Sequence, residues 1–518
     1  MSDGVDVNGA ESLVHTLLNS GVDTCFANPG TSEMHFVSAL DRIPGMHCVL
    51  ALAETVATGA ADGYARIAER PAVTLLHCGP GLANGLANLH NARRANSPIV
   101  NIVGDQATHH RPFDAPLTAD TEGMARAVSA WTRTATSATH LGRDAATAIQ
   151  AARTSPGQIA TLIVPSDTCW NSGGVVAEPL EVPATPQIDE GVLAPIARAL
   201  LSGERTVLFL GNDALREQTL SIAGRIAQKT GAMLMAPTSN RRIERGAGRV
   251  PIKRLAYPVD TALAELRDVK HMILVGTKAP VAFFAYPDKP SLLYPESCQV
   301  HVLSRPEQDQ LDALARLADR LGAIAPCATS PLATIDPAQG QPTPDGAAQT
   351  VAALLPEDAI VVEEGLTFGR SFYPMMANAP RHDWLHLTGG AIGSGLPLAT
   401  GAAVAGKGRR VVSLQADGSG MYSLQALWTQ ANEQLDVTTI IFANRKYAVL
   451  LGELAQVGAD AGKTALNMLD LSRPPLDWVH LANGMGVEAA KATTLEELAD
   501  LLIAANSRKG PFLIELVI

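Results

Sequence analysis

Residues 414–447 read LQADGSGMYSLQALWTQANEQLDVTTIIFANRKY, and this stretch places polar residues directly after two apolar runs. We expect a strand at 411–414, a helix at 422–433 and a second strand at 437–442. Parallel strands joined by a helix end at the same edge of their sheet, so Asp417 and Asn444 should emerge together there. Open α/β sheets bind their ligands at this carboxyl edge.

The residue types at this edge indicate a magnesium-bridged diphosphate site. Asp and Asn side chains offer hard oxygen ligands, but they carry too little charge to hold Mg²⁺ without phosphate and water. The backbone amides of Gly418 and Ser419, at the start of the expected helix, would point at an anion. The alternative is an ordinary strand-to-helix turn with Asp417 as its N-cap.

Two stretches rich in Pro, Gly and Ala, at 171–187 and 325–346, lack helical periodicity and divide the 518 residues into three segments. We place the domains at 1–172, 188–325 and 345–518. Each segment alternates short β-branched runs with amphipathic stretches, which is typical of parallel sheets covered on both faces. The predicted fold class is α/β, with three doubly wound parallel-sheet domains. The buried strands are expected within 71–77, 97–104, 205–211, 271–276, 358–365, 409–415, 437–443 and 511–518.

The composition is that of a packed globular protein, with 47% apolar and 18% charged residues. A net charge of -11 argues against a nucleic-acid partner, and we interpret the basic cluster at 240–249 as a solvated loop. Six cysteines without a CxxC pair indicate a reducing compartment and no zinc site. We find no secretory signal and no membrane span, so we expect a cytoplasmic protein.

Four further stretches extend the argument beyond the diphosphate motif. They are FANPGTSEMHFVSAL (26–40), LALAETVATGAADGYAR (50–66), LLHCGPGLANGLANL (75–89) and LTGGAIGSGLPLATGAA (387–403). Together with Asp-Gly-Ser and the downstream Asn, they resemble the thiamin-diphosphate enzymes of the acetolactate synthase and benzoylformate decarboxylase superfamily. The resemblance runs from about residue 11 to 518 and is weakest in the middle segment. Two positions depart from the family motif, since Ala416 replaces its leading Gly and Ala443 its first Asn.

The resemblance implies thiamin diphosphate and Mg²⁺ as cofactors, with pyrimidine-binding, central and diphosphate-binding domains in chain order. It implies that Mg²⁺ is bound by the side chains of Asp417 and Asn444 and by the backbone carbonyl of Lys446. Ile392 would wedge between the two cofactor rings, and the Gly390 carbonyl would accept from the exocyclic amine; a plain Gly-rich loop is the alternative. The implied cofactor-binding residues are Gly30, Thr367, Gly390, Ile392, Asp417, Gly418, Ser419, Asn444 and Tyr447.

Glu54, His77, Thr31 and Gln106 are the candidate catalytic residues. Glu54 lies among apolar residues, where burial should favour a protonated carboxyl, and the resemblance implies that it activates the aminopyrimidine. A helix-start Glu that only complements the helix dipole is the alternative. By resemblance, Thr31 would hold the substrate carboxylate, His77 would relay protons and Gln106 would lie near the cofactor.

Several family features are missing or altered. The decarboxylase uses a second His from the middle domain, but that region contains Phe283 and Phe284 instead. His109 and His110 are similar to a paired His of pyruvate decarboxylases, although their flanking residues fit poorly. Leu450 stands where those enzymes place a catalytic Glu. Acetolactate synthases hold FAD in the middle domain, but LFLGNDA at 208–214 contains no GxGxxG, so FAD is disfavoured here.

The resemblance implies thiamin-diphosphate-dependent decarboxylation of a 2-oxo acid, with release of an aldehyde or carboligation to an acyloin. The enzyme would be a lyase or an acetolactate-synthase-type transferase, and the substrate side chain and the acceptor stay open. A catalytically degenerate cofactor-binding subunit is the main alternative, and an NAD oxidoreductase is disfavoured. Family members pair the Glu-bearing domain of one chain with the Asp-bearing domain of another, so we expect a homodimer or homotetramer, without nucleic-acid or membrane partners.

Overall fold

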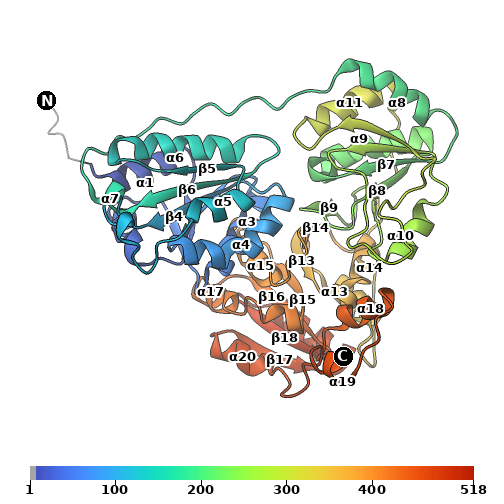
Figure 1. The fold of residues 1–518 in the computed structure, drawn as a ribbon. Coiled ribbons are helices and arrows are strands. Elements are labelled where there is room, and N and C mark those ends of the chain that lie inside the picture. The colour runs from blue at the N-terminus through green and yellow to red at the C-terminus, as the bar shows by residue number, and fades with distance from the viewer. Residues whose placement is uncertain (1–6) are drawn as a thin grey trace.

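Three β-sheets, each covered by helices, make up the computed structural model, which describes residues 7–518 (Figure 1). The eight buried strands expected from sequence are all present, within one or two residues of their predicted bounds. The fold class is therefore confirmed. Continuous β-branched runs form these strands because both faces of each sheet are buried.

The first sheet has six parallel strands in the order β2-β1-β3-β4-β6-β5. Its strands are β1 (Thr24–Ala27), β2 (His47–Leu50), β3 (Ala72–Leu76), β4 (Ile99–Asp105), β5 (Trp131–Thr134) and β6 (Ile159–Pro165). Its helices are α1 (Gly9–Asn19), α2 (Met34–Arg42), α3 (Glu54–Ala68), α4 (Cys78–Arg94), α5 (Thr121–Val128), α6 (Ala138–Arg153) and α7 (Ser166–Trp170).

The second sheet has five parallel strands in the order β10-β8-β7-β11-β12 and follows the extended segment at 171–187, which contains no helix and no regular strand (Figure 1). Its strands are β7 (Thr206–Leu210), β8 (Met233–Ala236), β10 (Lys253–Arg254), β11 (His271–Val275) and β12 (Gln299–Ser304). Its helices are α8 (Leu193–Leu200), α9 (Glu217–Thr230), α10 (Val259–Leu266) and α11 (Gln310–Leu321).

The third sheet has seven strands in the order β17-β18-β16-β15-β13-β14-β9. Its strands are β9 (Ile243–Arg245), β13 (Ala359–Glu364), β14 (His382–His386), β15 (Val411–Ala416), β16 (Val437–Ala443), β17 (Glu488–Ala492) and β18 (Phe512–Val517). Its helices are α12 (Pro344–Leu354), α13 (Leu366–Gly369), α14 (Phe372–Met375), α15 (Gly395–Ala405), α16 (Asp417–Gly420), α17 (Ala426–Asn432), α18 (Ala448–Gln456), α19 (Lys463–Asn467), α20 (Trp478–Gly484) and α21 (Leu495–Asn506).

Helices α3 and α15 hold the first and third sheets together through glycine contacts. A methyl group at Gly63 would lie 2.0 Å from the carbonyl oxygen of Leu398, and one at Gly401 would lie 1.7 Å from that of Ala60. No larger residue fits at either position without displacing backbone. Arg66, buried on α3, pairs with Asp62 at 2.5 Å. The N-terminal and C-terminal segments therefore meet across a close helix pair rather than a loose linker.

The basic cluster at 240–249 is not the solvated loop that its composition suggested. Part of it forms β9, which pairs antiparallel with β14 and so joins a strand from the middle of the chain to the third sheet. Arg242 binds Asp383 and Glu244, each at 2.9 Å, and the Arg245 guanidinium lies 3.6 Å from the Tyr373 ring centre. Ion pairs and a cation–π contact satisfy these charges inside the protein.

The single helix expected at 422–433 is also shorter than predicted. The chain forms α16 at 417–420, turns through 421–425 and then forms α17 at 426–432. Gly420, at the end of α16, is closely packed, because a methyl group there would lie 2.7 Å from the Trp478 ring. The turn keeps the Asp417 end of α16 at the sheet edge. No helix in residues 7–518 is long and apolar enough to cross a membrane.

Candidate active site

Asp417 and the 444–446 segment meet at the carboxyl edge of the third sheet, since β15 and β16 are parallel neighbours. Oδ2 of Asp417 accepts a hydrogen bond from the backbone amide of Arg445 at 2.6 Å, and Oδ1 accepts one from Gly418 at 2.8 Å. Burial raises the pKa of the Asp417 carboxyl, although these amide donors oppose the shift. The carboxylate is thus buried among backbone groups, where a bound cation would offset its desolvation.

Asn444 and Lys446 offer the other two predicted metal ligands. The side-chain oxygen of Asn444 accepts from the Lys446 amide at 3.0 Å, and the Lys446 carbonyl accepts from the Ala448 amide at 3.0 Å. Each oxygen retains a second lone pair for a metal ion. A cavity of about 380 Å³ opens beside them and is lined by Asn444, Arg445, Lys446, Leu451, Leu466, Leu469, Asp470 and Ser472.

The glycine loop at 388–395 is fixed by a residue that the sequence analysis missed, Glu364 at the end of β13. Its carboxylate accepts hydrogen bonds from the amides of Gly393 (2.6 Å) and Gly395 and from the Ser394 hydroxyl (3.1 Å). Burial raises the pKa of Glu364. An acidic residue at the carboxyl end of a predicted strand was the signal that could have identified it.

Gly390 requires its glycine, because φ is +80° and the Phe283 ring would lie 2.5 Å from an added methyl group. Phe283 comes from the middle segment and makes an edge-to-face contact with Phe284 and a tilted contact with Tyr257, at centroid distances of 5.0 and 5.5 Å. The Tyr257 hydroxyl in turn donates to Glu453 of α18 at 3.1 Å. The aromatic segment, which stands where the decarboxylase has its second His, therefore forms an apolar wall against the predicted cofactor loop.

The remaining predicted cofactor residues lie around the same sheet edge. Ser419 is buried and bonds Gln415 at 2.5 Å, while Tyr447 covers the turn, its ring 2.6 Å from a methyl group added at Gly418. Thr367 is exposed on α13 and Ile392 is half-buried in the glycine loop. Leu450 is exposed on α18. Ser419, Tyr447, Thr367 and Ile392 stay predicted contacts of the cofactor. Leu450 places an apolar side chain where pyruvate decarboxylases have a catalytic Glu.

A second group of predicted residues gathers at the carboxyl edge of the first sheet. A methyl group at Gly30 would overlap the His77 ring at 2.2 Å, so the ring lies directly against the 28–31 loop. His77 Nδ1 is 3.0 Å from Oε2 of Glu33, which also accepts from the Gly30 amide at 2.7 Å. Glu33 is another residue that the sequence analysis missed, because only the fold brings positions 33 and 77 together.

Glu54 begins α3 next to this group. Its side chain is buried and accepts a hydrogen bond from Asn84 at 3.2 Å. A methyl group at Gly81 would be 2.8 Å from Glu54 Oε1 and 3.4 Å from His77 Cβ. Gly81 therefore lies between the two candidate catalytic side chains. Thr31 is exposed on the neighbouring loop and Gln106 is half-buried after β4.

The glycine loop contacts both α3 and α4 of the same chain. Arg66 donates to the carbonyl of His386 at 2.8 Å and to the Thr388 hydroxyl at 3.1 Å, so the far end of α3 touches the glycine loop. Glu54 stands twelve residues earlier on that helix, which at 1.5 Å per residue is about 18 Å along its axis. Asn91 of α4 donates to the Ala391 carbonyl at 2.7 Å and to Asn88, which donates to the Thr55 carbonyl beside Glu54, so the loop also reaches the Glu54 end of α3.

His109 and His110 do not join the His77 group through any contact. The His109 ring lies 6.4 Å from Trp170 and the His110 ring lies 6.0 Å from Phe113, and both residues are exposed. Their surroundings are an aromatic surface after β4 rather than a hydrogen-bonded pair.

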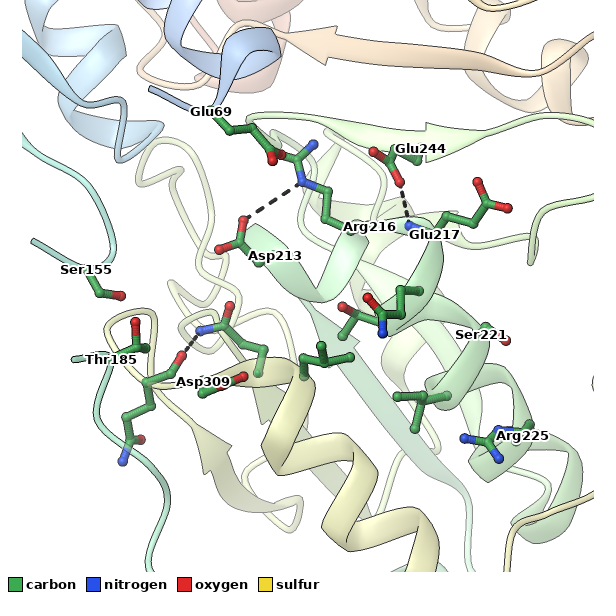
Figure 2. Close-up of a pocket in the computed structure, with 16 residues that line it drawn as sticks. Glu69, Ser155, Thr185, Asp213, Arg216, Glu217, Ser221, Arg225, Glu244 and Asp309 are labelled. Carbon is green, nitrogen blue, oxygen red and sulfur yellow. Dashed lines mark hydrogen bonds and ion pairs between the residues drawn. The ribbon is translucent and has the colours of Figure 1, made fainter. Parts of the chain in front are cut away.

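A larger cavity of about 1000 Å³ lies at the carboxyl ends of β7 and β12, beside α9 (Figure 2). Five carboxylates line it, belonging to Glu69, Asp213, Glu217, Glu244 and Asp309. Arg216 already pairs with Glu69 at 2.8 Å, and Glu244 accepts from the Glu217 amide at 2.6 Å (Figure 2). The diphosphate of a flavin would meet like charge here, so this donor set does not fit FAD.

The sheet-edge residues fit a diphosphate with Mg²⁺ much better. Asp417, Asn444 and the Lys446 carbonyl supply oxygen ligands with free lone pairs, and the Arg445 charge and the backbone amides offset the burial of the Asp417 carboxylate only in part. Such a set binds Mg²⁺ when phosphate oxygens and water complete the octahedron.

Two protein-family models match the chain. The model for the N-terminal TPP binding domain of thiamine pyrophosphate enzymes matches residues 7–127, and the model for their C-terminal TPP binding domain matches residues 369–516. These two regions hold the Glu54–His77 group and the Asp417–Asn444 edge.

Similar proteins cover the full length of the chain. The Mycobacterium tuberculosis protein named "Putative acetolactate synthase large subunit IlvX" is 52% identical over 519 residues, covering 99% of each chain. Benzoylformate decarboxylase of Pseudomonas aeruginosa is 28% identical, covering 96% of each. The structure of a Rhodococcus jostii RHA1 thiamine diphosphate-dependent 4-hydroxybenzoylformate decarboxylase matches with a TM-score of 0.85 and 25% identity, over 98% of each chain.

Proposed function

Because the chain belongs to the thiamine pyrophosphate enzymes, we propose that it decarboxylates a 2-oxo acid, either releasing an aldehyde or joining the remaining acyl unit to a second carbonyl. The main support is the 2.6 Å hydrogen bond from the Arg445 amide to Asp417 Oδ2. It brings Asp417 and the 444–446 segment, with the proposed magnesium ligands, to one sheet edge. Thiamin diphosphate, when bound, supplies the carbanion chemistry that loss of CO₂ requires.

The protein residues then have distinct roles. Asp417, Asn444 and the Lys446 carbonyl would hold Mg²⁺, and the glycine loop ordered by Glu364 would support the cofactor rings. Glu54 would share a proton with the aminopyrimidine, and His77 would move protons at the reacting carbon. Thr31 would bind the substrate carboxylate, with Gln106 nearby.

We further propose that each active site forms between two chains, as a homodimer or a dimer of dimers. The support is the exposed apolar surface beside each group of candidate residues. Leu50 and Leu52, beside Glu54, and Tyr422, beside Gly393, are exposed apolar side chains, which suits surfaces that become buried on pairing.

The apolar wall of Phe283, Phe284 and Tyr257 supports a substrate with an apolar or aromatic side chain. The absence of His in that segment leaves His77 as the principal proton carrier, which favours competence in carboligation alongside aldehyde release. Both the lyase and the transferase assignments are consistent with these residues.

A product screen tests the proposal. The purified protein, with thiamin diphosphate and Mg²⁺, is incubated with pyruvate, benzoylformate and branched 2-oxo acids, with and without acceptor aldehydes, and products are identified by mass spectrometry. We expect CO₂ with an aldehyde or an acyloin from at least one acid. Cofactor-induced thermal stabilisation without any product would instead support a degenerate cofactor-binding subunit, to which the substitutions at Ala416 and Ala443 point.

A further inference from the structure

Glu33, His77 and Cys78 form a cluster of potential metal ligands at the carboxyl edge of the first sheet. Among the His, Cys, Asp and Glu residues of 7–518, these three form a group in which the ligand atoms all lie within 4.8 Å of one another. His77 Nδ1 is 3.0 Å from Glu33 Oε2 and 3.8 Å from Cys78 Sγ. The Ser32 hydroxyl adds a fourth donor, 3.1 Å from Cys78 Sγ and 3.4 Å from His77 Nδ1.

The spacing of these four atoms matches a tetrahedral site. Zinc binds nitrogen and oxygen at about 2.0–2.2 Å and sulfur at about 2.3 Å, so ligand atoms at the corners of such a tetrahedron stand about 3.3–3.8 Å apart. Four of the distances among these residues run from 3.0 to 3.8 Å, while the Ser32 hydroxyl donates to Glu33 Oε1 in a shorter contact. An ion could therefore enter once the Ser32 hydroxyl moves away from the Glu33 carboxylate.

The donor chemistry selects the kind of ion. A thiolate, an imidazole and a carboxylate together suit Zn²⁺, Co²⁺ and Cd²⁺, whereas Mg²⁺ prefers oxygen alone. With neutral His77, the thiolate and the Glu33 carboxylate carry two negative charges, which a divalent ion neutralises. The scattered cysteine spacing predicted no zinc site, but a mixed site of this kind has no CxxC signature.

We propose that Glu33, His77 and Cys78, with Ser32, bind a thiophilic divalent metal ion, and that its binding reversibly inhibits the enzyme. A metal on Nδ1 would occupy the nitrogen that faces Glu33 and would stop the ring from carrying a second proton. The inhibition rests on the proposed proton-relay role of His77. The binding of the metal rests only on the geometry of the four residues.

Proton competition sets the pH dependence of this site. Burial raises the pKa of the Cys78 thiol to about 11, with a smaller contribution from the negative charges of Glu33 and Asp105, while the Ser32 hydroxyl opposes the shift. Arg111 lies 3.5 Å from Asp105 and moderates its charge. Metal binding must release the proton of the thiol.

The test uses the full-length, cofactor-free protein titrated with CoCl₂, followed by the cobalt–thiolate charge-transfer absorption, and with ZnCl₂ by calorimetry. We expect one ion per chain. C78S should abolish the cobalt–thiolate band and weaken Zn²⁺ binding by more than about 100-fold, since even outer partners of metal ligands are worth 10–100-fold. C48S, which removes an exposed thiol, is the matched control and should leave both signals unchanged.

Three results would overturn the metal site: no cobalt–thiolate band in the parent protein, a band that survives in C78S, or a band lost in C48S. E33Q provides a second variant and should weaken Zn²⁺ binding while retaining the thiolate band. Thermal unfolding of each variant establishes that it is folded.

The inhibition is measured on the cofactor-loaded enzyme, each variant being compared with its own metal-free rate. Zn²⁺ should slow the parent and C48S at concentrations that leave C78S unaffected. Metal binding without inhibition of turnover would overturn the inhibitory role. Metal binding in a protein that turns over no 2-oxo acid would instead refute the proposed function and leave the metal site standing.

Discussion

Nδ1 of His77 lies 3.0 Å from Oε2 of Glu33, a carboxylate that is 3% exposed. A carboxylate on one ring nitrogen fixes the orientation of the imidazole and stabilises the tautomer whose other nitrogen is free to exchange protons. Glu33 is thus a positioning residue for the proposed proton relay.

Replacing this carboxylate should impair turnover. We expect E33Q to lower kcat by about 10–100-fold, the range typical of residues that orient a functional His, and to change the pH dependence of kcat/KM. Steady-state rates between pH 5 and 9 measure both. E178Q, at an exposed position of the extended segment at 171–187, is a matched control. An E33Q enzyme with an unaltered pH profile would assign Glu33 a purely structural role.

Removing the Glu54 carboxyl should lower the catalytic rate without preventing the cofactor from binding. Gln keeps the shape of the side chain and its contact with Asn84, but it cannot share a proton with the aminopyrimidine. We expect E54Q to lose about 10²–10⁴-fold in kcat, as is typical of a general acid or base, while it keeps its thermal stabilisation by thiamin diphosphate. More than half of the parent rate in E54Q would contradict this role.

Magnesium binding should depend on Asp417 and on pH. A ligand at 100 times its Kd stabilises a fold by about 2.7 kcal/mol, and D417N should lose this stabilisation by thiamin diphosphate with Mg²⁺. D470N, which alters an Asp lining the adjacent cavity, should retain it. Differential scanning fluorimetry with and without EDTA makes the comparison.

The sign of the pH effect follows from the raised pKa of Asp417. The protonated Asp417 carboxyl contributes to the free energy of unfolding at pH values below the ordinary pKa of Asp. This contribution is lost as the pH rises through the raised pKa of the folded protein. Metal competes with that proton, so Mg²⁺ affinity should fall as pH is lowered through the same value. Affinity that is constant across this range would count against Asp417 as a ligand.

Active sites shared between chains should show complementation. Mixed dimers of E54Q with D417N contain one site with both changes and one site with neither. If chains exchange freely, half of the dimers are mixed, and activity should recover to about one quarter of the parent value. Sites confined to single chains would give no recovery, because every chain carries one inactivating change.

The buried Asp62–Arg66 pair should be important for stability. Arg66 is 1% exposed and connects α3 to the glycine loop, so D62A would leave an uncompensated buried charge. Breaking one side of such a pair costs about 3–5 kcal/mol, which denaturant unfolding followed by tryptophan fluorescence should detect. A loss below about 1 kcal/mol, as for exposed ion pairs, would show that Arg66 finds other partners.

Local sequence patterns determined the three sheets and the position of the diphosphate edge. Continuous β-branched runs can be buried on both faces only in parallel sheets, and chain direction then places Asp417 and the 444–446 segment at one edge. Neither step requires knowledge of how the domains pack. The same local reasoning could not predict β9, because its pairing with β14 requires contact between two segments about 140 residues apart in the sequence.

Only the tertiary structure decided how charged and catalytic side chains are partnered. The arginines at 240–249 look solvated in sequence, yet they are buried because acidic and aromatic partners come from β14 and α14. Glu33 ends a short 3-10 turn after β1, and His77 and Cys78 lie where β3 leads into α4, so only the parallel strands β1 and β3 bring them together. Sequence fixes which residues follow each strand, whereas contacts between strand ends depend on sheet order, and so does the chemistry of the site.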